Sequence, residues 1–260
     1  YFVSDGQDLS TPELVRAVAV ALGRPARLVP VPVVLFNLAG CVGDGPAAEF
    51  AGFAAIEGIA VDVPDGRGGR RQFGNLLLSR LPVRQVWRHL LPWPGDADHA
   101  DMQRIAVEAV IEAPDIGELR VTTTHLGYYS AAQRLAQIDG LRMLHALAHG
   151  HRVKPARADM SNGPFHWQPR PAAGIVCGDC NCEPGSPGHA RMLERFDDGT
   201  PAFRDAWDLT HPGQPHEPTV GLYDTVQWPR RFACDFVFVS EDLAPRVQAL
   251  RVDACSDASD

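Results

Sequence analysis

The sequence predicts an α/β (α+β) domain in which antiparallel strand pairs are combined with a few helices. Three observations carry this prediction. Two apolar segments, residues 104–113 and 119–124, flank a Pro/Asp/Gly turn at 114–117, which is the pattern of an antiparallel hairpin. Ser130 precedes a segment with leucine and isoleucine at helical spacing. A short apolar run at 172–177 has the composition of a buried strand.

Composition limits the size and the partners of this domain. The chain has 260 residues, 45% of them hydrophobic, which is enough for one sizeable core or for one domain and a fragment. Its net charge is −8, and its isoelectric point is near 5.7. Because nucleic-acid-binding surfaces are usually basic, this balance argues against a general polyanion binder and mildly against duplex DNA as a substrate.

Six cysteines occur, at positions 41, 177, 180, 182, 234 and 255. No secretory signal precedes them and no apolar run reaches membrane-spanning length, so we expect reduced thiols in a cytoplasmic protein without a membrane span. The spacing Cys177-x-x-Cys180-x-Cys182 invites a zinc or redox interpretation. A second pair with matching spacing is absent, and Cys177 falls inside the predicted strand, which argues against zinc.

The first forty residues differ from the rest. They predict a strand and turn at 1–6 and a helix that Ser10 or Thr11 caps, with Pro12 in its first turn and Gly23 at its end. Residues 1–42 resemble the C-terminal part of extended short-chain dehydrogenase/reductase sugar epimerases. That family's glycine-rich dinucleotide loop and Tyr-x-x-x-Lys pair do not follow, so an NAD-dependent epimerase is the least favoured function.

A joint rich in Gly, Pro and Ala at 40–48 predicts a domain boundary, after which a second domain extends over 48–260. We expect strands at 54–63 and 73–82, separated by a glycine-rich turn at 65–69. Later segments predict a loop at 152–171, a short helix at 192–196, packed structure at 205–208, a His/Pro loop at 211–218 and a strand at 232–240.

Polar residues stand at the ends of several of these strands. His125 ends the expected hairpin, Asp179 and Asn181 follow the buried strand, and Asp235 interrupts a later apolar strand. An aspartate can take a proton from water, and an asparagine can stabilise an oxyanion without adding charge. For three of these residues, interpretations without a functional role remain open. His125 could bond to backbone, Asp235 could pair with an arginine such as Arg231, and the final Asp260 could be a frayed terminus.

Five motifs then follow one another: Gly74-Asn75-Leu76-Leu77-Leu78-Ser79-Arg80-Leu81-Pro82, Thr124-His125-Leu126 with the helix of Arg134 and Gln137, Gly178-Asp179-Cys180-Asn181, Cys234-Asp235-Phe236-Val237-Phe238-Val239-Ser240, and Ala258-Ser259-Asp260. In this order they resemble the endonuclease/exonuclease/phosphatase superfamily of metal-dependent phosphohydrolases, the group of deoxyribonuclease I, sphingomyelinases and inositol-phosphate phosphatases. The resemblance covers residues 48–260. It implies a four-layer sandwich of two mostly antiparallel sheets flanked by helices, here lacking its first strands.

The resemblance also implies roles. Asp179 would orient or deprotonate the attacking water, and Asn181 would stabilise the transition state. His125 takes the place of a catalytic or phosphate-binding histidine, and Asp235 that of the partner of a histidine beyond the last residue. Asp260 would belong to the metal and phosphate shell. The expected cofactor is Mg²⁺ or Mn²⁺, which take carboxylate and amide oxygens as ligands.

The sequence departs from this pattern at both ends. The opening Asn strand and the metal-binding Gln-Glu-Val are not found, Glu49 and Glu57 are weak substitutes, and the chain stops where a Ser-Asp-His would finish. We therefore expect an incomplete phosphohydrolase with impaired activity. The alternative is a catalytically inactive binding or interaction module on the same fold. The resemblance implies a phosphate-ester substrate. Nucleic acid, lipid and small esters stay open as substrates, and so does the oligomeric state.

Overall fold

The computed structural model describes residues 53–66, 68–155, 170–222 and 226–252, so the expected elements in residues 1–42 and the residues Glu49 and Asp260 lie outside it. The helices and strands are β1 (Ala54–Pro64), β2 (Arg70–Ser79), β3 (Val83–Leu90), β4 (Ile105–Ala113), β5 (Gly117–His125), α2 (Ala131–Val153), β6 (Gly174–Asp179), α3 (Pro187–Leu193), β7 (Phe203–Asp205), α4 (Ala206–Thr210), β8 (Asp235–Ser240) and the 3-10 helix η3 (Ala244–Arg246).

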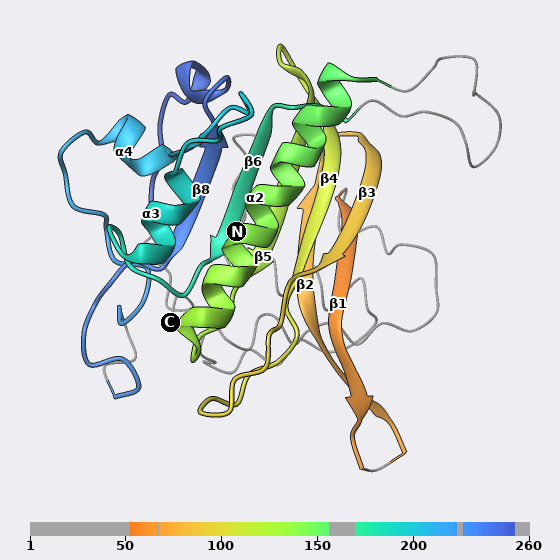
Figure 1. The fold of residues 1–260 in the computed structure, drawn as a ribbon, viewed down its shortest axis with the longest axis vertical. Helices are drawn as coiled ribbons and strands as arrows, with labels where there is room; N and C mark the ends of the chain where they lie inside the picture. The colour runs from red at the N-terminus through yellow and green to blue at the C-terminus, as the bar shows by residue number, and fades with distance from the viewer. Residues whose placement is uncertain (1–52, 67, 156–169, 223–225, 253–260) are drawn as a thin grey trace.

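The larger sheet has six strands in the order β3-β4-β5-β6-β8-β7. Neighbouring strands are antiparallel except β5 and β6, which are parallel. A parallel pair needs a crossover connection, and here α2 makes that connection on one face of the sheet (Figure 1). The carboxyl ends of β5 and β6 therefore meet at the same edge of the sheet.

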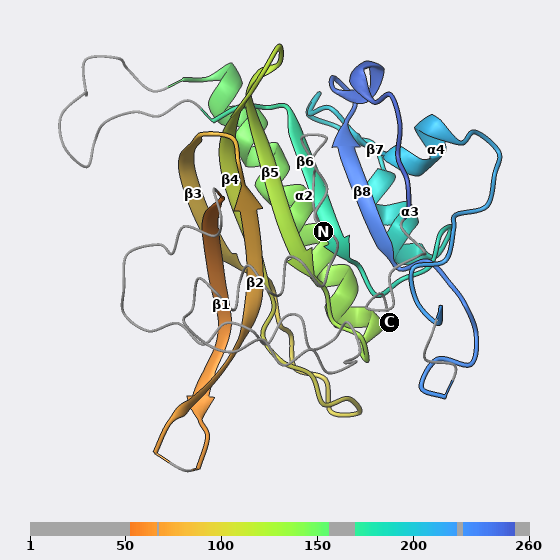
Figure 2. The same ribbon diagram turned by 180° about the vertical axis from the view of Figure 1, so that it is seen from behind.

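The two-stranded sheet β1–β2 packs on the opposite face, over β4 and β5 (Figure 2). The large sheet thus separates two apolar cores. The core on the α2 side includes Leu126, Ile138, Val176, Phe236 and Phe238. The core on the β1–β2 side includes Ile56, Leu77, Val107, Val121 and Val239. Two mostly antiparallel sheets with helices outside confirm the predicted fold class.

Local sequence explains most of the elements. In the hairpin between β4 and β5, Asp115 and Gly117 adopt φ values of 60° and 87°, which aspartate and glycine tolerate best. The Ser130 hydroxyl accepts a hydrogen bond from the Gln133 amide at 3.1 Å and caps α2, as the sequence predicts. β4 is buried along nearly its whole length because β1–β2 covers one face and α2 the other.

Two differences from the sequence prediction stand out. β3 (Val83–Leu90) was not predicted from the sequence. Arg84, Arg88 and His89 give this segment a polar composition, which is typical of an edge strand. α3 begins at Pro187 rather than at residue 192, because Ser186 caps it and Pro187 occupies its first position.

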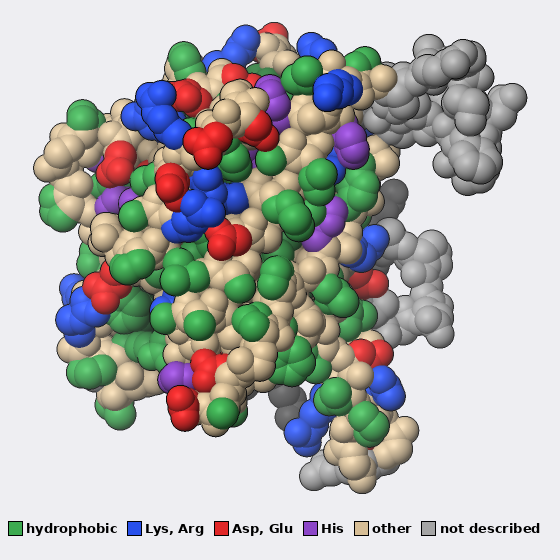
Figure 3. Space-filling model, viewed as in Figure 1, with side chains coloured by type: hydrophobic (Ala, Val, Ile, Leu, Met, Phe, Trp, Pro, Cys, Tyr) green, Lys and Arg blue, Asp and Glu red, His purple; other side chains and the backbone are tan. Residues whose placement is uncertain are grey.

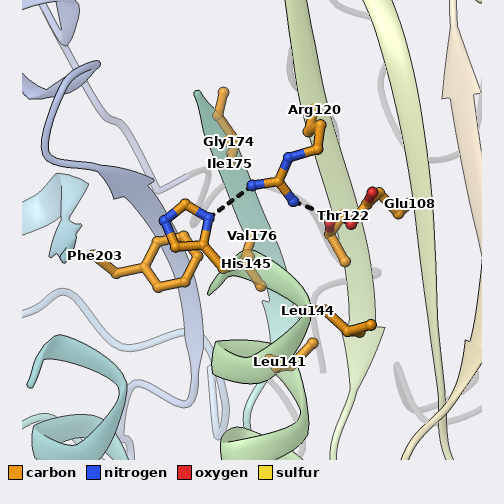
Figure 4. Close-up of a pocket in the computed structure, with 10 residues that line it drawn as sticks. All are labelled: Glu108, Arg120, Thr122, Leu141, Leu144, His145, Gly174, Ile175, Val176 and Phe203. Carbon is orange, nitrogen blue, oxygen red and sulfur yellow. Dashed lines mark hydrogen bonds and ion pairs between the residues drawn. The ribbon is translucent and has the colours of Figure 1, made fainter. Parts of the chain in front are cut away.

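A buried ionic cluster links β4 and β5 to the segment before β6. Glu108 on β4, only 1% exposed, accepts hydrogen bonds from Arg120 at 3.1 Å and from Arg170 at 2.9 Å. Figure 4 shows Arg120 between Glu108 and His145 of α2. Nη2 of Arg120 lies 2.7 Å from Nδ1 of His145. The adjoining cavity is about 10 Å³, the room of a single water, so this cluster joins β4, β5 and α2 and offers no space for a ligand.

Candidate active site

Strand register brings three of the predicted residues into one row. His125 is the register partner of Asp179 on the parallel strand β6, and Asp179 is the partner of Asp235 on β8. The row therefore crosses three neighbouring strands at one edge of the sheet. The sequence alone predicted polar strand ends, and the pairing of the strands places them side by side.

The three side chains also share a face. Side chains alternate along a strand, so His125 points to the same side as Val121, and Asp235 to the same side as Val239. Both valines belong to the core under β1–β2. The ring of Phe73, from β2, approaches His125 edge-on with 5.9 Å between ring centroids. The row consequently lies at the open end of the space between the two sheets.

His125 and Asp179 are close enough to interact. Nε2 of His125 lies 3.5 Å from Oδ2 of Asp179, and the two side chains are 10% and 21% exposed. Burial lowers the pKa of His125, an effect that Asp179 partly offsets. The imidazole is therefore neutral at pH 7, and it borders an aspartate that solvent can reach.

Asn181 is held by the turn that follows β6. Its backbone adopts φ 49°, a left-handed conformation that asparagine tolerates, and its amide N–H donates to Asp179 Oδ1 at 2.7 Å. Its side-chain Nδ2 donates to the Leu126 carbonyl at 2.8 Å. The Leu126 N–H in turn donates to the Asp179 carbonyl at 2.9 Å. These bonds fix the loops after β5 and β6 against each other.

Gly178 lets these loops approach. Its φ is 141°, and a Cβ atom at this position would lie 1.9 Å from the Thr124 carbonyl oxygen. No side chain can be accommodated there, so the residue before Asp179 has to be glycine for β5 and β6 to pair up to their ends.

Asp235 completes the row beside a cysteine. Burial raises the pKa of Asp235 to about 7, and the Cys234 thiol donates a weak hydrogen bond to its Oδ2 at 3.6 Å. Ligand atoms of Asp179, Cys234 and Asp235 lie within 4.8 Å of one another. Burial also raises the pKa of the Cys234 thiol, which keeps it protonated. Two carboxylates with a protonated thiol suit a hard divalent cation better than zinc.

Sequence reasoning missed a second pair of charges near this row. Arg104 and Asp101 form a buried ion pair at 3.2 Å, and the Arg104 guanidinium lies 5.3 Å from the centre of the Phe73 ring. Both charges act on His125, Arg104 lowering its pKa and Asp101 raising it. The local sequence Met102-Gln103-Arg104 does not indicate that Arg104 lies near His125. That proximity depends on how the loop before β4 folds back.

The remaining predicted acid does not join the site. Glu57 alternates with Ile56, which faces the core, so its side chain lies on the face of β1 turned away from the larger sheet. Its backbone carbonyl accepts a hydrogen bond from Arg88 at 2.5 Å. A replacement metal ligand at Glu57 is therefore not supported.

A second group of possible metal ligands comprises His189, Asp205 and His216. Both imidazoles donate from Nε2 to Asp205 Oδ2, at 2.9 and 2.8 Å. Burial alone would raise the pKa of Asp205, but the hydrogen bonds from the two histidines hold that pKa below its usual value. The Gly185 N–H donates to His189 Nδ1, so the proton of this neutral ring sits on Nε2 and blocks metal binding there. This group has a structural role in anchoring α3 to α4.

In the part of the chain that the structure describes, no helix is both long and apolar enough to cross a membrane.

One family model matches the sequence. A family model described as the endonuclease/exonuclease/phosphatase family matches residues 14–260. No protein of curated function matches the sequence.

Among the solved structures that resemble this one, a mannosyl-6-phosphatase of Bacteroides thetaiotaomicron is 16% identical, with a TM-score of 0.49 over 73% of this chain and 63% of that one. The human nocturnin catalytic domain with bound sulfate is 17% identical, with a TM-score of 0.47 over 74% and 62%. An endonuclease/exonuclease/phosphatase from Beutenbergia cavernae is 20% identical, with a TM-score of 0.48 over 88% and 58%. The chain spans less than two thirds of each of these structures.

Proposed function

The chain belongs to the endonuclease/exonuclease/phosphatase family, and we propose from this membership that it hydrolyses phosphoric esters with a water molecule activated at Asp179. The observation that carries the proposal is the row of His125, Asp179 and Asp235 across three neighbouring strands. A base, a neutral imidazole and a second carboxylate in one row have the chemistry that phosphoryl transfer to water requires.

Asp179 is the proposed base. Its Oδ1 is occupied by the Asn181 amide, which leaves Oδ2 on the side of His125 to take a proton from water. An aspartate that solvent reaches and that is held by a backbone N–H has a fixed orientation, which makes it effective as a positioned base.

His125 and Asn181 are the proposed phosphate-binding groups. A neutral imidazole can donate one hydrogen bond to a phosphate oxygen without a net charge, and burial keeps His125 neutral. Asn181 uses Nδ2 to bind the Leu126 carbonyl, so its side-chain position is fixed relative to Asp179. Preorganised polar groups of this kind stabilise the transition state more than groups that must reorient.

Asp179 and Asp235 fit a divalent cation, with Asp260 proposed as a further ligand. Mg²⁺ or Mn²⁺ bound there would neutralise phosphate charge and lower the pKa of a coordinated water. The raised pKa of Asp235 agrees with a carboxyl group that lacks a nearby positive charge in the described residues. The chain's own contribution is to hold two carboxylates close together at the edge of the sheet.

The test is hydrolysis of bis-p-nitrophenyl phosphate in Mg²⁺ or Mn²⁺, with EDTA as the reference. We expect metal-dependent turnover that Asp179→Asn lowers by about a thousandfold, whereas Asp197→Asn, at an exposed acid outside the site, leaves it unchanged. Turnover that survives in Asp179→Asn would contradict the proposal. Absence of both turnover and Mg²⁺ binding by calorimetry in a folded chain would assign it to the inactive binding module instead.

A further inference from the structure

A groove with aromatic walls adjoins the candidate active site. Its lining includes Tyr128, Arg134, Asn181, Trp228 and Phe232, which we call the aromatic groove. Its volume is about 620 Å³, within the range of small-molecule sites. On the face shown in Figure 3, hydrophobic side chains gather around a hollow below α3 and beside the N-terminal end of α2.

The aromatic groove borders the candidate active site at Asn181. This residue lines the groove and also donates its backbone N–H to Asp179 Oδ1. The loop of Tyr128 directly follows Leu126, whose N–H donates to the Asp179 carbonyl. A substituent of a phosphate ester bound at Asp179 would have to pass Asn181 to reach the groove.

Three rings form one wall of the groove. The Trp228 ring lies 5.8 Å from that of Tyr128, at 78°, and 5.9 Å from that of Phe232, at 68°. Such edge-to-face contacts fix the rings relative to one another. Tyr128 is nevertheless 44% exposed, so aromatic surface remains available to a ligand.

Two arginines hold the walls in place. Arg134 on α2 donates from Nη1 to the Gly127 and Tyr128 carbonyls, both at 2.9 Å. Arg230 donates to both carboxylate oxygens of Glu183, at 2.8 and 2.5 Å, and joins the loop after β6 to the loop of Trp228. The groove is therefore built before a ligand arrives and carries positive charge beside aromatic rings.

We infer that the aromatic groove is a subsite for a nucleobase, so that the substrates are nucleotide-sized phosphate esters. This inference rests on the proposed function, because the base would be positioned by a phosphate at Asp179. Nucleobases stack on aromatic side chains and on arginine planes, and Trp228, Phe232 and the Arg230 guanidinium, 5.0 Å from the Phe232 ring centre, supply both kinds of surface.

Size and charge distinguish this ligand from others. The groove has room for one nucleoside, and the net charge of −8 disfavours a long polyanion. A lipid chain would meet the polar side chains of Arg134, Glu183 and Arg230 in the same lining, and an apolar tail cannot replace the water that hydrates them. A sugar phosphate without a base would leave the rings unstacked.

The first test needs no variant. AMP and ribose 5-phosphate share the phosphate and the sugar, so their affinities for the unaltered chain, measured by calorimetry in Ca²⁺, which takes the same oxygen ligands as Mg²⁺, differ by the base alone. We expect AMP to bind about tenfold more tightly or better, as one stacked base contributes. Equal affinities, or no detectable binding of AMP, would overturn the inference.

The second test uses Trp228→Ala with Trp93→Ala as its control, because Trp93 is a tryptophan that is exposed and is not part of the groove lining. Trp228→Ala should weaken AMP binding about tenfold, and Trp93→Ala should not change it. Unchanged AMP binding in a folded Trp228→Ala variant would overturn the inference. If that variant does not fold, the comparison of AMP with ribose 5-phosphate on the unaltered chain decides.

Turnover separates the two proposals. Methyl p-nitrophenyl phosphate has no base and reports on the proposed function alone, which fails if Asp179→Asn does not slow it. Thymidine 5′-p-nitrophenyl phosphate has the same leaving group and carries a nucleoside, sugar and base, in place of the methyl group. We expect a KM about tenfold lower for it, with the difference abolished by Trp228→Ala. Equal KM values for the two esters would reject the nucleobase subsite while leaving phosphohydrolysis intact.

Discussion

His125 and Asp179 are register partners on neighbouring parallel strands, and Nε2 of the first lies 3.5 Å from Oδ2 of the second. The contact arises from the backbone, because both residues end their strands at one edge of the sheet and point to one face. A pair of side chains placed in this way depends little on side-chain flexibility. Its geometry should therefore respond to changes in the strands as well as to changes in the two residues.

Removing the imidazole should slow hydrolysis. His125→Gln retains a hydrogen-bonding side chain of similar length but cannot act as an imidazole, so we expect kcat to fall about a hundredfold with a smaller change in KM. His151→Gln, at an exposed histidine in the last turn of α2, serves as the control. A kcat that is unchanged in His125→Gln would remove His125 from the site.

Gly178 should not tolerate a side chain. In Gly178→Ala the new Cβ would lie 1.9 Å from the Thr124 carbonyl oxygen, so the ends of β5 and β6 must separate. We expect a loss of more than about 3 kcal/mol in the free energy of unfolding, measured by urea denaturation.

Gly150→Ala is the matched control for that experiment. A Cβ at Gly150 meets no atom within 4 Å, and the residue lies in α2. Alanine there should stabilise the chain by about 0.5–1 kcal/mol. If both substitutions gave the same effect, the steric explanation for Gly178 would be wrong.

The buried Glu108 should be essential for stability. Glu108→Gln removes the charge that compensates the buried guanidinium groups of Arg120 and Arg170, and we expect a loss of about 3–5 kcal/mol. The control is Glu112→Gln on the same strand, which breaks the exposed ion pair with Arg84 and should cost less than about 1 kcal/mol. Similar losses in the two variants, measured by thermal or urea unfolding, would contradict this account.

Acid should destabilise the fold through His145. Burial, together with the neighbouring Arg120, lowers the pKa of His145 from 6.5 to about 4. Its Nδ1 accepts from Arg120 and its Nε2 donates to the Pro201 carbonyl, so both ring nitrogens are already engaged in the neutral form.

The unfolded chain binds this proton more readily than the folded chain, so stability is complete above pH 6.5 and falls as the pH drops through the window from 6.5 to about 4. The contribution of His145 to this loss is about 3 kcal/mol. Urea midpoints at pH 7.5 and 5 should converge in His145→Gln and stay apart in His151→Gln. An unchanged pH dependence in His145→Gln would assign the effect to other groups.

Much of the fold could be predicted from local sequence signals. The hairpin of β4 and β5, the Ser130 cap and the strand that ends at Asp179 each depend on residues within a few positions of one another. β3 escaped prediction because an exposed edge strand carries charged residues, and its position depends on pairing with β4. The domain division at 40–48 and the resemblance of residues 1–42 to a dehydrogenase stay predictions.

Part of the candidate site could likewise be predicted from local sequence, and part of it could not. His125, Asp179 and Asp235 could be proposed from strand ends, and the structure brings them into one row. The groove could not be proposed, because Tyr128 and Trp228 lie a hundred residues apart and meet only when two loops fold together. The neighbourhood of Arg104 and His125 likewise depends on tertiary structure. The roles of Asn181 and Asp260 in catalysis are proposals that the substitutions above and a metal titration would test.

The crossover through α2 also has a kinetic consequence. The Asn181 side chain and the Leu126 carbonyl that it binds are 55 residues apart in sequence, and the parallel pairing of β5 with β6 depends on closing that loop. Such long-range contacts carry a large entropic barrier and form late when a chain folds. A nascent or partly folded chain would thus have its hairpins and α2 before it had the proposed phosphate site, and ligand binding there would report completion of folding.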